Sequence, residues 1–145
     1  MQTIYFICTG NTCRSPMAQV LFDLHREEHD PWVAKSCGLY AMDGMPASEF
    51  AIQAAAELGA DLSSHRSAAI SADKVAEAAY LICMTAAQRD ALCRQFPEAE
   101  EKAFTLCSFD ISDPFGAGLE TYRKTAREID QGVQTLLAQL KGRES

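Results

Sequence analysis

Residues 3–16 read Thr3-Ile4-Tyr5-Phe6-Ile7-Cys8-Thr9-Gly10-Asn11-Thr12-Cys13-Arg14-Ser15-Pro16, and the organisation of the chain follows from this stretch. Residues 3–7 are of strand-forming type, and they run directly into a short loop with Gly10 and Asn11 at its centre. Ser15 is a favourable N-cap and Pro16 a favourable first helical residue, so a helix should begin here. A strand, a short loop and a helix N-terminus form an anion-binding site, because unpaired backbone N–H groups and the positive end of the helix dipole converge there.

The loop begins with a thiol, Cys8, and ends with a guanidinium, Arg14, and this pair suits phosphate chemistry. A helix N-terminus and a nearby cation favour the nucleophilic thiolate form of a cysteine. The planar fork of Arg14 can hold two phosphate oxygens. Gly10 and Asn11 readily adopt positive φ, which would turn successive N–H groups inward. The predicted mechanism is attack by Cys8 on phosphorus, formation of a phosphocysteine, and its hydrolysis.

The Cys-x5-Arg spacing alone is weak evidence, because Cys83 and Arg89 show it as well. That second copy contains no glycine, and its second half has the composition of a helix, so we interpret it as a coincidence. The first copy differs in the strand before it, the Gly-Asn pair inside it and the Ser-Pro helix start after it. An ordinary strand–helix turn with an incidental buried cysteine remains the alternative for the first copy.

Working outward, strands alternate with helices along the whole chain. Strands are predicted at residues 3–7, 32–38, 80–84 and 103–107, and helices at residues 15–29, 47–58, 72–79 and 85–95, the last of these capped by Thr85. A final helix carries an apolar stripe at steps of three and four, interpreted as a core face: Leu119, Tyr122, Ala126, Ile129, Val133, Leu136, Leu137 and Leu140. This order predicts an open α/β sheet, whose ligands bind beyond the carboxyl ends of the strands, where Cys8 lies.

Bulk properties exclude several classes of protein. A length of 145 residues suits one domain, and no apolar stretch approaches the ~20 residues of a membrane span. A net charge of −7 argues against a nucleic-acid partner. Because the N-terminus has no signal-type pattern, we expect a cytoplasmic protein with no membrane association, whose six cysteines are reduced. No zinc-type spacing of histidine and cysteine occurs, so no metal site is predicted.

The stretch from Cys8 to Pro16 resembles the C-x-G-N-x-C-R-S-P signature of the low-molecular-weight protein tyrosine phosphatase family. A second family element, Asp113-Pro114 followed by an aromatic residue, occurs far downstream, so the resemblance covers nearly the whole chain. It implies a single domain over residues 1–145 with a flavodoxin-like three-layer αβα fold, a four-stranded parallel sheet, and no metal or organic cofactor.

The resemblance also implies roles for individual residues. Asp113 matches the general acid, which would protonate the leaving group and then activate water against the phosphocysteine. Ser15 would donate a hydrogen bond to the Cys8 thiolate, and Asn11, Ser36 and His65 match positions that brace the phosphate loop. The predicted substrate-binding residues are Thr9, Gly10, Asn11, Thr12, Cys13, Ser15 and Phe115. Without the family, Asp-Pro is a common turn, Ser36 a strand-end residue and His65 a loop histidine.

Cys13 lies five residues after the predicted nucleophile in the same tight loop. We hypothesise that oxidants form a Cys8–Cys13 disulfide that protects Cys8 from irreversible oxidation, which mass spectrometry of peroxide-treated protein would test. The alternative is that Cys13 is an inert buried residue.

Two positions bear on the substrate. Thr12 stands where tyrosine-specific members typically carry an aliphatic residue, and Phe115-Gly116 follows Asp113-Pro114 where they carry two tyrosines. Both departures resemble the bacterial protein-arginine phosphatase branch, with C-T-G-N-T-C-R-S-P and D-P-F-G. The expected substrate is therefore a protein carrying phosphoarginine, and inorganic phosphate is the expected product. Phosphotyrosine is the alternative.

Two further functions stay open at this point. A thiol-dependent arsenate reductase shares this fold and a Cys-x5-Arg loop, but it needs two more cysteines that relay a disulfide. Cys83 is placed plausibly, whereas Cys93 follows ten residues later across a predicted helix, in which that spacing separates α-carbons by about 15 Å. A non-catalytic phosphate-binding module is the other possibility, although binding alone would not require Cys8, Arg14 and Asp113 together.

Overall fold

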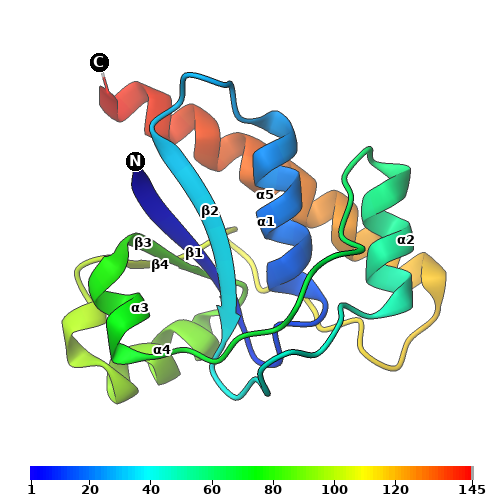
Figure 1. The fold of residues 1–145 in the computed structure, drawn as a ribbon, viewed down its shortest axis with the longest axis horizontal. Helices are drawn as coiled ribbons and strands as arrows, with labels where there is room; N and C mark the ends of the chain where they lie inside the picture. The colour runs from blue at the N-terminus through cyan, green and yellow to red at the C-terminus, as the bar shows by residue number, and fades with distance from the viewer. Residues whose placement is uncertain (145) are drawn as a thin grey trace.

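The computed structural model describes residues 1–144, which form one four-stranded sheet with helices on both faces (Figure 1). The strands are β1 (Gln2–Cys8), β2 (Trp32–Gly38), β3 (Ala78–Cys83) and β4 (Ala103–Thr105), in the order β2-β1-β3-β4. Every neighbouring pair is parallel. The predicted α/β fold with a four-stranded parallel sheet is therefore confirmed, and β1 lies at the point where the chain switches from one side of the sheet to the other.

The alternation of side chains along β1 explains the two cores of the molecule. Ile4 and Phe6 face the helices α1 (Arg14–His25), α2 (Glu49–Glu57) and α5 (Leu119–Glu144). Tyr5 and Ile7 face the opposite layer, formed by α3 (Ala72–Glu77) and α4 (Ala86–Gln95). Figure 1 shows α1 and α5 crossing one face of the sheet and α3 and α4 on the other. Because β1 is buried on both faces, its sequence is apolar almost throughout.

The apolar stripe of the last helix packs as the sequence predicts. Six of its members are buried in the core with α1 and the sheet, namely Tyr122, Ala126, Ile129, Val133, Leu137 and Leu140. Leu119 and Leu136 are half-buried. None of the helices in residues 1–144 has the length and apolar character needed to cross a membrane.

Several element boundaries differ from the predicted ones: α3 ends at Glu77 rather than at residue 79, and β3 spans Ala78–Cys83 rather than residues 80–84. Helix α1 ends at His25 rather than at residue 29, because Arg26 is extended and the Asp30 carboxylate accepts the backbone N–H of Glu27 to make a turn. Helix α2 begins at Glu49, since the Ser48 side chain caps it. Strand β4 ends at Thr105, whose hydroxyl donates to the carbonyl of Cys107 and turns the chain away from the sheet. The cap of α4 by Thr85 is confirmed.

Candidate active site

The loop of residues 9–13 joins the carboxyl end of β1 directly to α1. Cys8 is the last residue of β1 and Arg14 the first of α1, whose N-cap residue, Cys13, makes no side-chain capping bond. The prediction that Ser15 caps this helix is wrong. Ser15 lies one residue inside α1, and its hydroxyl is engaged by the thiol of Cys8 instead.

Two donors surround the sulfur of Cys8. The backbone N–H of Asn11 donates to Sγ at 3.3 Å, and Ser15 Oγ lies 2.9 Å from Sγ. Asn11 Nδ2 donates to Ser15 Oγ at 2.8 Å, while Asn11 Oδ1 accepts the backbone N–H of Ala68 at 2.9 Å. These bonds fix the orientation of the Asn11 carboxamide, so the Ser15 proton points at the sulfur. The two donors fix the position of the sulfur at the base of the loop, facing the cavity that the loop lines.

Asn11 is the residue that shapes the loop. It is fully buried and has φ of 57°, in the left-handed region that asparagine tolerates. Gly10 was predicted to share this conformation but does not have positive φ. The carbonyl of Asn11 accepts a hydrogen bond from His65 Nε2 at 2.8 Å, so His65 braces the loop at the position the resemblance implied. Burial lowers the pKa of His65, and its neutral ring carries the proton on Nε2.

Gly38 brings the end of β2 into contact with the same loop. It pairs with Cys8 in the sheet, and a Cβ at Gly38 would lie 2.6 Å from the carbonyl oxygen of Thr9 and 3.1 Å from the nitrogen of Asn11. Only glycine leaves room for the loop at this point. The sequence analysis missed this requirement; the available signal was a glycine that ends the strand next to β1.

Ser36 does not brace the loop, contrary to the prediction. Its hydroxyl donates to Gln19 Oε1 at 2.8 Å, which ties β2 to α1. Ser36 lies two residues before the end of β2, about 6.6 Å short of the loop along the strand. Ser36 was correctly predicted to lie in the second strand, but its hydroxyl bonds to Gln19 and not to the phosphate loop.

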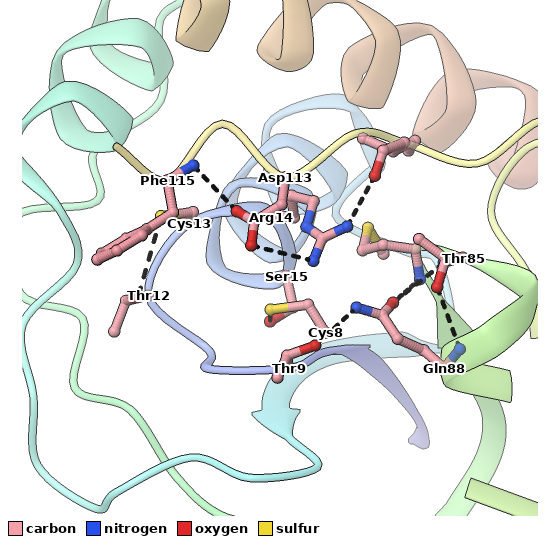
Figure 2. A network of polar contacts seen from close by, with 12 residues as sticks. Cys8, Thr9, Thr12, Cys13, Arg14, Ser15, Thr85, Gln88, Asp113 and Phe115 are labelled. Carbon is pink, nitrogen blue, oxygen red and sulfur yellow. Dashed lines mark hydrogen bonds and ion pairs between the residues drawn. The ribbon is translucent and has the colours of Figure 1, made fainter. Parts of the chain in front are cut away.

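Arg14 and Asp113 close the other side of the site (Figure 2). Arg14 is buried and donates from one terminal nitrogen to the carbonyl of Ile111 at 2.7 Å. Its other terminal nitrogen lies 3.7 Å from Asp113 Oδ2. The second Asp113 oxygen accepts the backbone N–H of Phe115 at 3.0 Å, which holds the carboxylate over the loop. The Asp113 side chain is 54% exposed, so water and substrate reach it.

A cavity of about 220 Å³ lies between the loop and the Asp113 segment. Nine residues predicted from the sequence line it: Cys8, Thr9, Gly10, Asn11, Thr12, Cys13, Arg14, Asp113 and Phe115. Four larger cavities, of about 420, 750, 380 and 700 Å³, lie elsewhere on the molecule, and none of them is lined by Cys8, Arg14 or Asp113. The structure thus brings together two segments that are far apart in the sequence around one small cavity.

Cys13 is the last residue of the loop, and its side chain is buried and faces α5. Its sulfur lies 3.4 Å from the Tyr122 hydroxyl and 3.5 Å from Ser48 Oγ. The thiol is thus embedded in polar contacts on the side of α2 and α5, and a Cys8–Cys13 disulfide stays a prediction.

The second Cys-x5-Arg copy forms no comparable loop. Cys83 ends β3 in the core, and burial raises the pKa of its thiol to about 12. Arg89 lies in α4 and donates from Nε to the carbonyl of Ala103 at 2.8 Å. The interpretation of this copy as a coincidence agrees with the structure.

Within residues 1–142, one group of side chains could hold a metal ion: Glu27, His29 and Asp30. These residues form the turn after α1, at the opposite end of that helix from Arg14. The active-site cavity contains no histidine, and its acidic lining residue, Asp113, faces Arg14.

Cysteine-dependent phosphatases combine a thiol at the end of a buried strand with an arginine six residues later at the start of a helix, and the fold and site place the chain in this class. The sequence model of the family described as "Low molecular weight phosphotyrosine protein phosphatase" matches residues 3–145. The chain belongs to this family.

Several known proteins resemble the chain over nearly its full length. A protein-arginine-phosphatase from Geobacillus stearothermophilus is 37% identical over 143 residues, which cover 94% of this chain and 95% of that protein. The solved YwlE arginine phosphatase from the same organism matches with a TM-score of 0.93 and 34% identity, covering 99% of this chain and 96% of that one. A YwlE cysteine-to-serine mutant with a phosphorylated active-site serine matches with a TM-score of 0.91 and 31% identity, over 97% and 96% of the two chains.

An arsenate reductase is also among the relatives. Arsenate reductase 1 from Staphylococcus epidermidis is 33% identical over 134 residues, covering 92% of this chain and 94% of that protein. In the present structure Cys83 is the last residue of β3 and Cys93 lies in α4, so the two cysteines are not part of one continuous helix. The argument from helical spacing was therefore too strict. The burial of Cys83 is the better argument against a disulfide relay.

Proposed function

We propose that the chain is a protein-arginine phosphatase that hydrolyses phosphoarginine through a phosphocysteine on Cys8. The observation that carries this proposal is the Cys8 thiol, held by Ser15 and Asn11 in a cavity that Arg14, Asp113 and Thr12 also line. Binding alone would not require a thiol held in this way next to an exposed carboxylate.

In the first step, the Cys8 thiolate attacks phosphorus and the P–N bond to the arginine side chain breaks. Asp113 gives its proton to the departing nitrogen of the arginine side chain. No negative charge therefore builds up on that nitrogen as the P–N bond breaks. The guanidinium of Arg14 uses N–H groups not engaged by Ile111 to hold the phosphoryl oxygens. The loop N–H groups around Asn11 stabilise the charge that develops on them.

In the second step, the Asp113 carboxylate accepts a proton from water, and the water oxygen attacks phosphorus. The P–S bond breaks, inorganic phosphate forms, and the Cys8 sulfur returns to the thiolate state that Ser15 stabilises. The phosphorylated serine in the YwlE mutant supports a covalent intermediate of this kind.

Thr12 and Phe115 support phosphoarginine over phosphotyrosine. Thr12 is half-buried at the edge of the cavity, where its hydroxyl can bind the polar guanidinium. Phe115 is 76% exposed and offers an aromatic face on which a guanidinium can stack. The name of the relatives from Geobacillus stearothermophilus supports the same choice.

The partners and location follow from this function. The substrate is a phosphorylated protein, the product is inorganic phosphate, and no nucleic acid takes part. All six cysteines are free, which suits the reducing cytoplasm and the thiol chemistry of Cys8. We treat residues 1–145 as one phosphatase domain.

The test compares two peptides of identical flanking sequence, one with phosphoarginine and one with phosphotyrosine. We expect a higher kcat/KM for phosphoarginine, and loss of turnover with retained peptide binding in Cys8→Ser. Cys83→Ala, in the second Cys-x5-Arg copy, should keep its activity and serves as the matched control. A higher kcat/KM for phosphotyrosine would establish the alternative substrate, and arsenate reduction that requires Cys83 and Cys93 would replace the phosphatase reading altogether.

A further inference from the structure

Gln88 is a buried polar residue in the first turn of α4, and no sequence motif drew attention to it. Only 7% of its surface is exposed. Its Oε1 accepts the backbone N–H groups of Met84 and Thr85 at 3.1 and 3.0 Å, which completes a capping box with Thr85. Because two N–H groups hold the carboxamide oxygen, Nε2 must face the other way, and it donates to Thr9 Oγ1 at 3.2 Å (Figure 2).

In this bond Thr9 Oγ1 is the acceptor, so the proton of the Thr9 hydroxyl remains to be donated to another group. A hydroxyl that accepts from an amide N–H can still donate its own proton. Among the side chains and backbone of residues 1–142, no group accepts it. Thr9 directly follows Cys8 and lines the active-site cavity, so the proton is available to a ligand bound there.

Asn11 and Ser15 form a similar arrangement on the other side of the loop, where they act on the Cys8 sulfur. The Asn11 carboxamide is oriented by the backbone N–H of Ala68, and it donates to Ser15 Oγ, whose proton then points at Cys8. Gln88 is oriented by the N–H groups of Met84 and Thr85, and it donates to Thr9. In both cases a carboxamide held by backbone N–H groups sets the direction of a hydroxyl proton.

We propose that Gln88 is a positioning residue, which holds the Thr9 hydroxyl as a hydrogen-bond donor to a phosphoryl oxygen bound above Cys8. This inference rests on the proposed function and adds one contact to it. A donor aimed at a phosphoryl dianion is a charge-assisted contact, the stronger kind of hydrogen bond. The contact also links the β3–α4 turn to the phosphate loop, from which it is separated by 79 residues of sequence.

The sharpest variant is Gln88→Glu. A carboxylate still accepts the N–H groups of Met84 and Thr85, so the helix cap survives, but it cannot donate to Thr9. It accepts the Thr9 proton instead and turns it away from the cavity. We expect kcat/KM for the phosphorylated peptide to fall about tenfold and the inhibition constant of inorganic phosphate to rise by a similar factor, at an unchanged Tm.

A double-mutant cycle with Thr9→Val separates this effect from the added negative charge. Thr9→Val removes the hydroxyl without touching the helix cap and should cost about the same tenfold, whereas Thr9→Ser should retain most activity. In the Thr9→Val background, Gln88→Glu should cost nothing further. Full activity of Thr9→Val, or the same loss from Gln88→Glu in both backgrounds, would overturn the proposal.

The design keeps this proposal distinct from the proposed function. If the wild-type protein turns over neither phosphopeptide, the proposed function fails, and binding of inorganic phosphate to the wild-type, Thr9→Val and Gln88→Glu proteins still tests the contact. Equal phosphate affinity in the three proteins would then contradict the role of Gln88. If the wild-type protein is active and the cycle shows no coupling, only the role of Gln88 fails.

Discussion

The hydroxyl of Thr12 is the group that best distinguishes the two possible substrates. Its nearest polar partner is the Cys13 sulfur at 3.9 Å, a weak contact that a substrate can replace easily. Its backbone, in contrast, is fixed, since its carbonyl accepts the N–H of Ser48 at 3.0 Å. The residue therefore presents a hydroxyl free to rotate on a rigid backbone, which suits a guanidinium better than an aromatic ring.

The substitution Thr12→Ile should lower kcat/KM for phosphoarginine about tenfold and leave phosphotyrosine turnover nearly unchanged, because it removes a bond to a charged group and adds only apolar contact. Turnover of the two peptides by the wild-type and variant proteins measures this. Thr12→Ser keeps the hydroxyl and should behave as the wild-type protein does. Equal losses on both peptides would show that Thr12 does not determine the preference for phosphoarginine over phosphotyrosine.

At the scale of elements, the site depends on how closely the end of β2 approaches the phosphate loop. A Cβ at Gly38 would meet backbone atoms of Thr9 and Asn11 as well as Ala41 Cβ at 2.9 Å, so the loop backbone would have to move to admit a side chain. Asn11 N–H is also the donor to the Cys8 sulfur, at 3.3 Å. A change in β2 is therefore expected to act on the nucleophile without touching it.

We expect Gly38→Ala to lower kcat/KM about 100-fold, since small displacements of catalytic groups cost that much, and to destabilise the fold by about 1–3 kcal/mol. Activity assays and urea unfolding measure the two effects. Gly118→Ala, where a Cβ would meet no atom within 4 Å, is the matched control and should change neither. Normal activity in Gly38→Ala would show that the loop tolerates the displacement.

The elements and the site were predictable to different degrees, for physical reasons. The run from Thr3 to Pro16 encodes strand, loop and helix start locally, so β1, the loop and the beginning of α1 were predicted close to their observed places. Ser15, in contrast, could cap the helix or serve the thiol, and only the packed loop decides between them. The contacts of Ser36 and Gln88 depend on side-chain direction and on partners 17 and 79 residues away, which periodicity does not specify.

At the scale of the whole molecule, the irregular segment between α2 and α3 connects the phosphate loop to the rest of the fold. The backbone N–H of Ala68 donates to Asn11 Oδ1, the Ala68 carbonyl accepts the N–H of Gly38, and His65 donates to the Asn11 carbonyl. A segment without regular structure is thus held by the loop that it supports. Stability and active-site geometry are coupled through these bonds, and the coupling has a pH dependence.

His65 determines the direction of that dependence. Burial lowers its pKa in the folded protein, whereas the unfolded chain titrates near the ordinary value of about 6.5. As the pH falls below about 6.5, the unfolded state binds a proton before the folded state does, so the free energy of unfolding falls.

His65→Gln keeps a donor for the Asn11 carbonyl and removes the titration. We therefore expect the free energy of unfolding, measured in urea at pH 7.5 and 5.5, to decrease less in His65→Gln than in the wild-type protein. The slope should differ by at most about 1.4 kcal/mol per pH unit, the limit for one proton. An identical pH dependence in the two proteins would mean that His65 takes up its proton as easily in the folded protein as in the unfolded chain, and that its bond to the loop is no barrier to protonation.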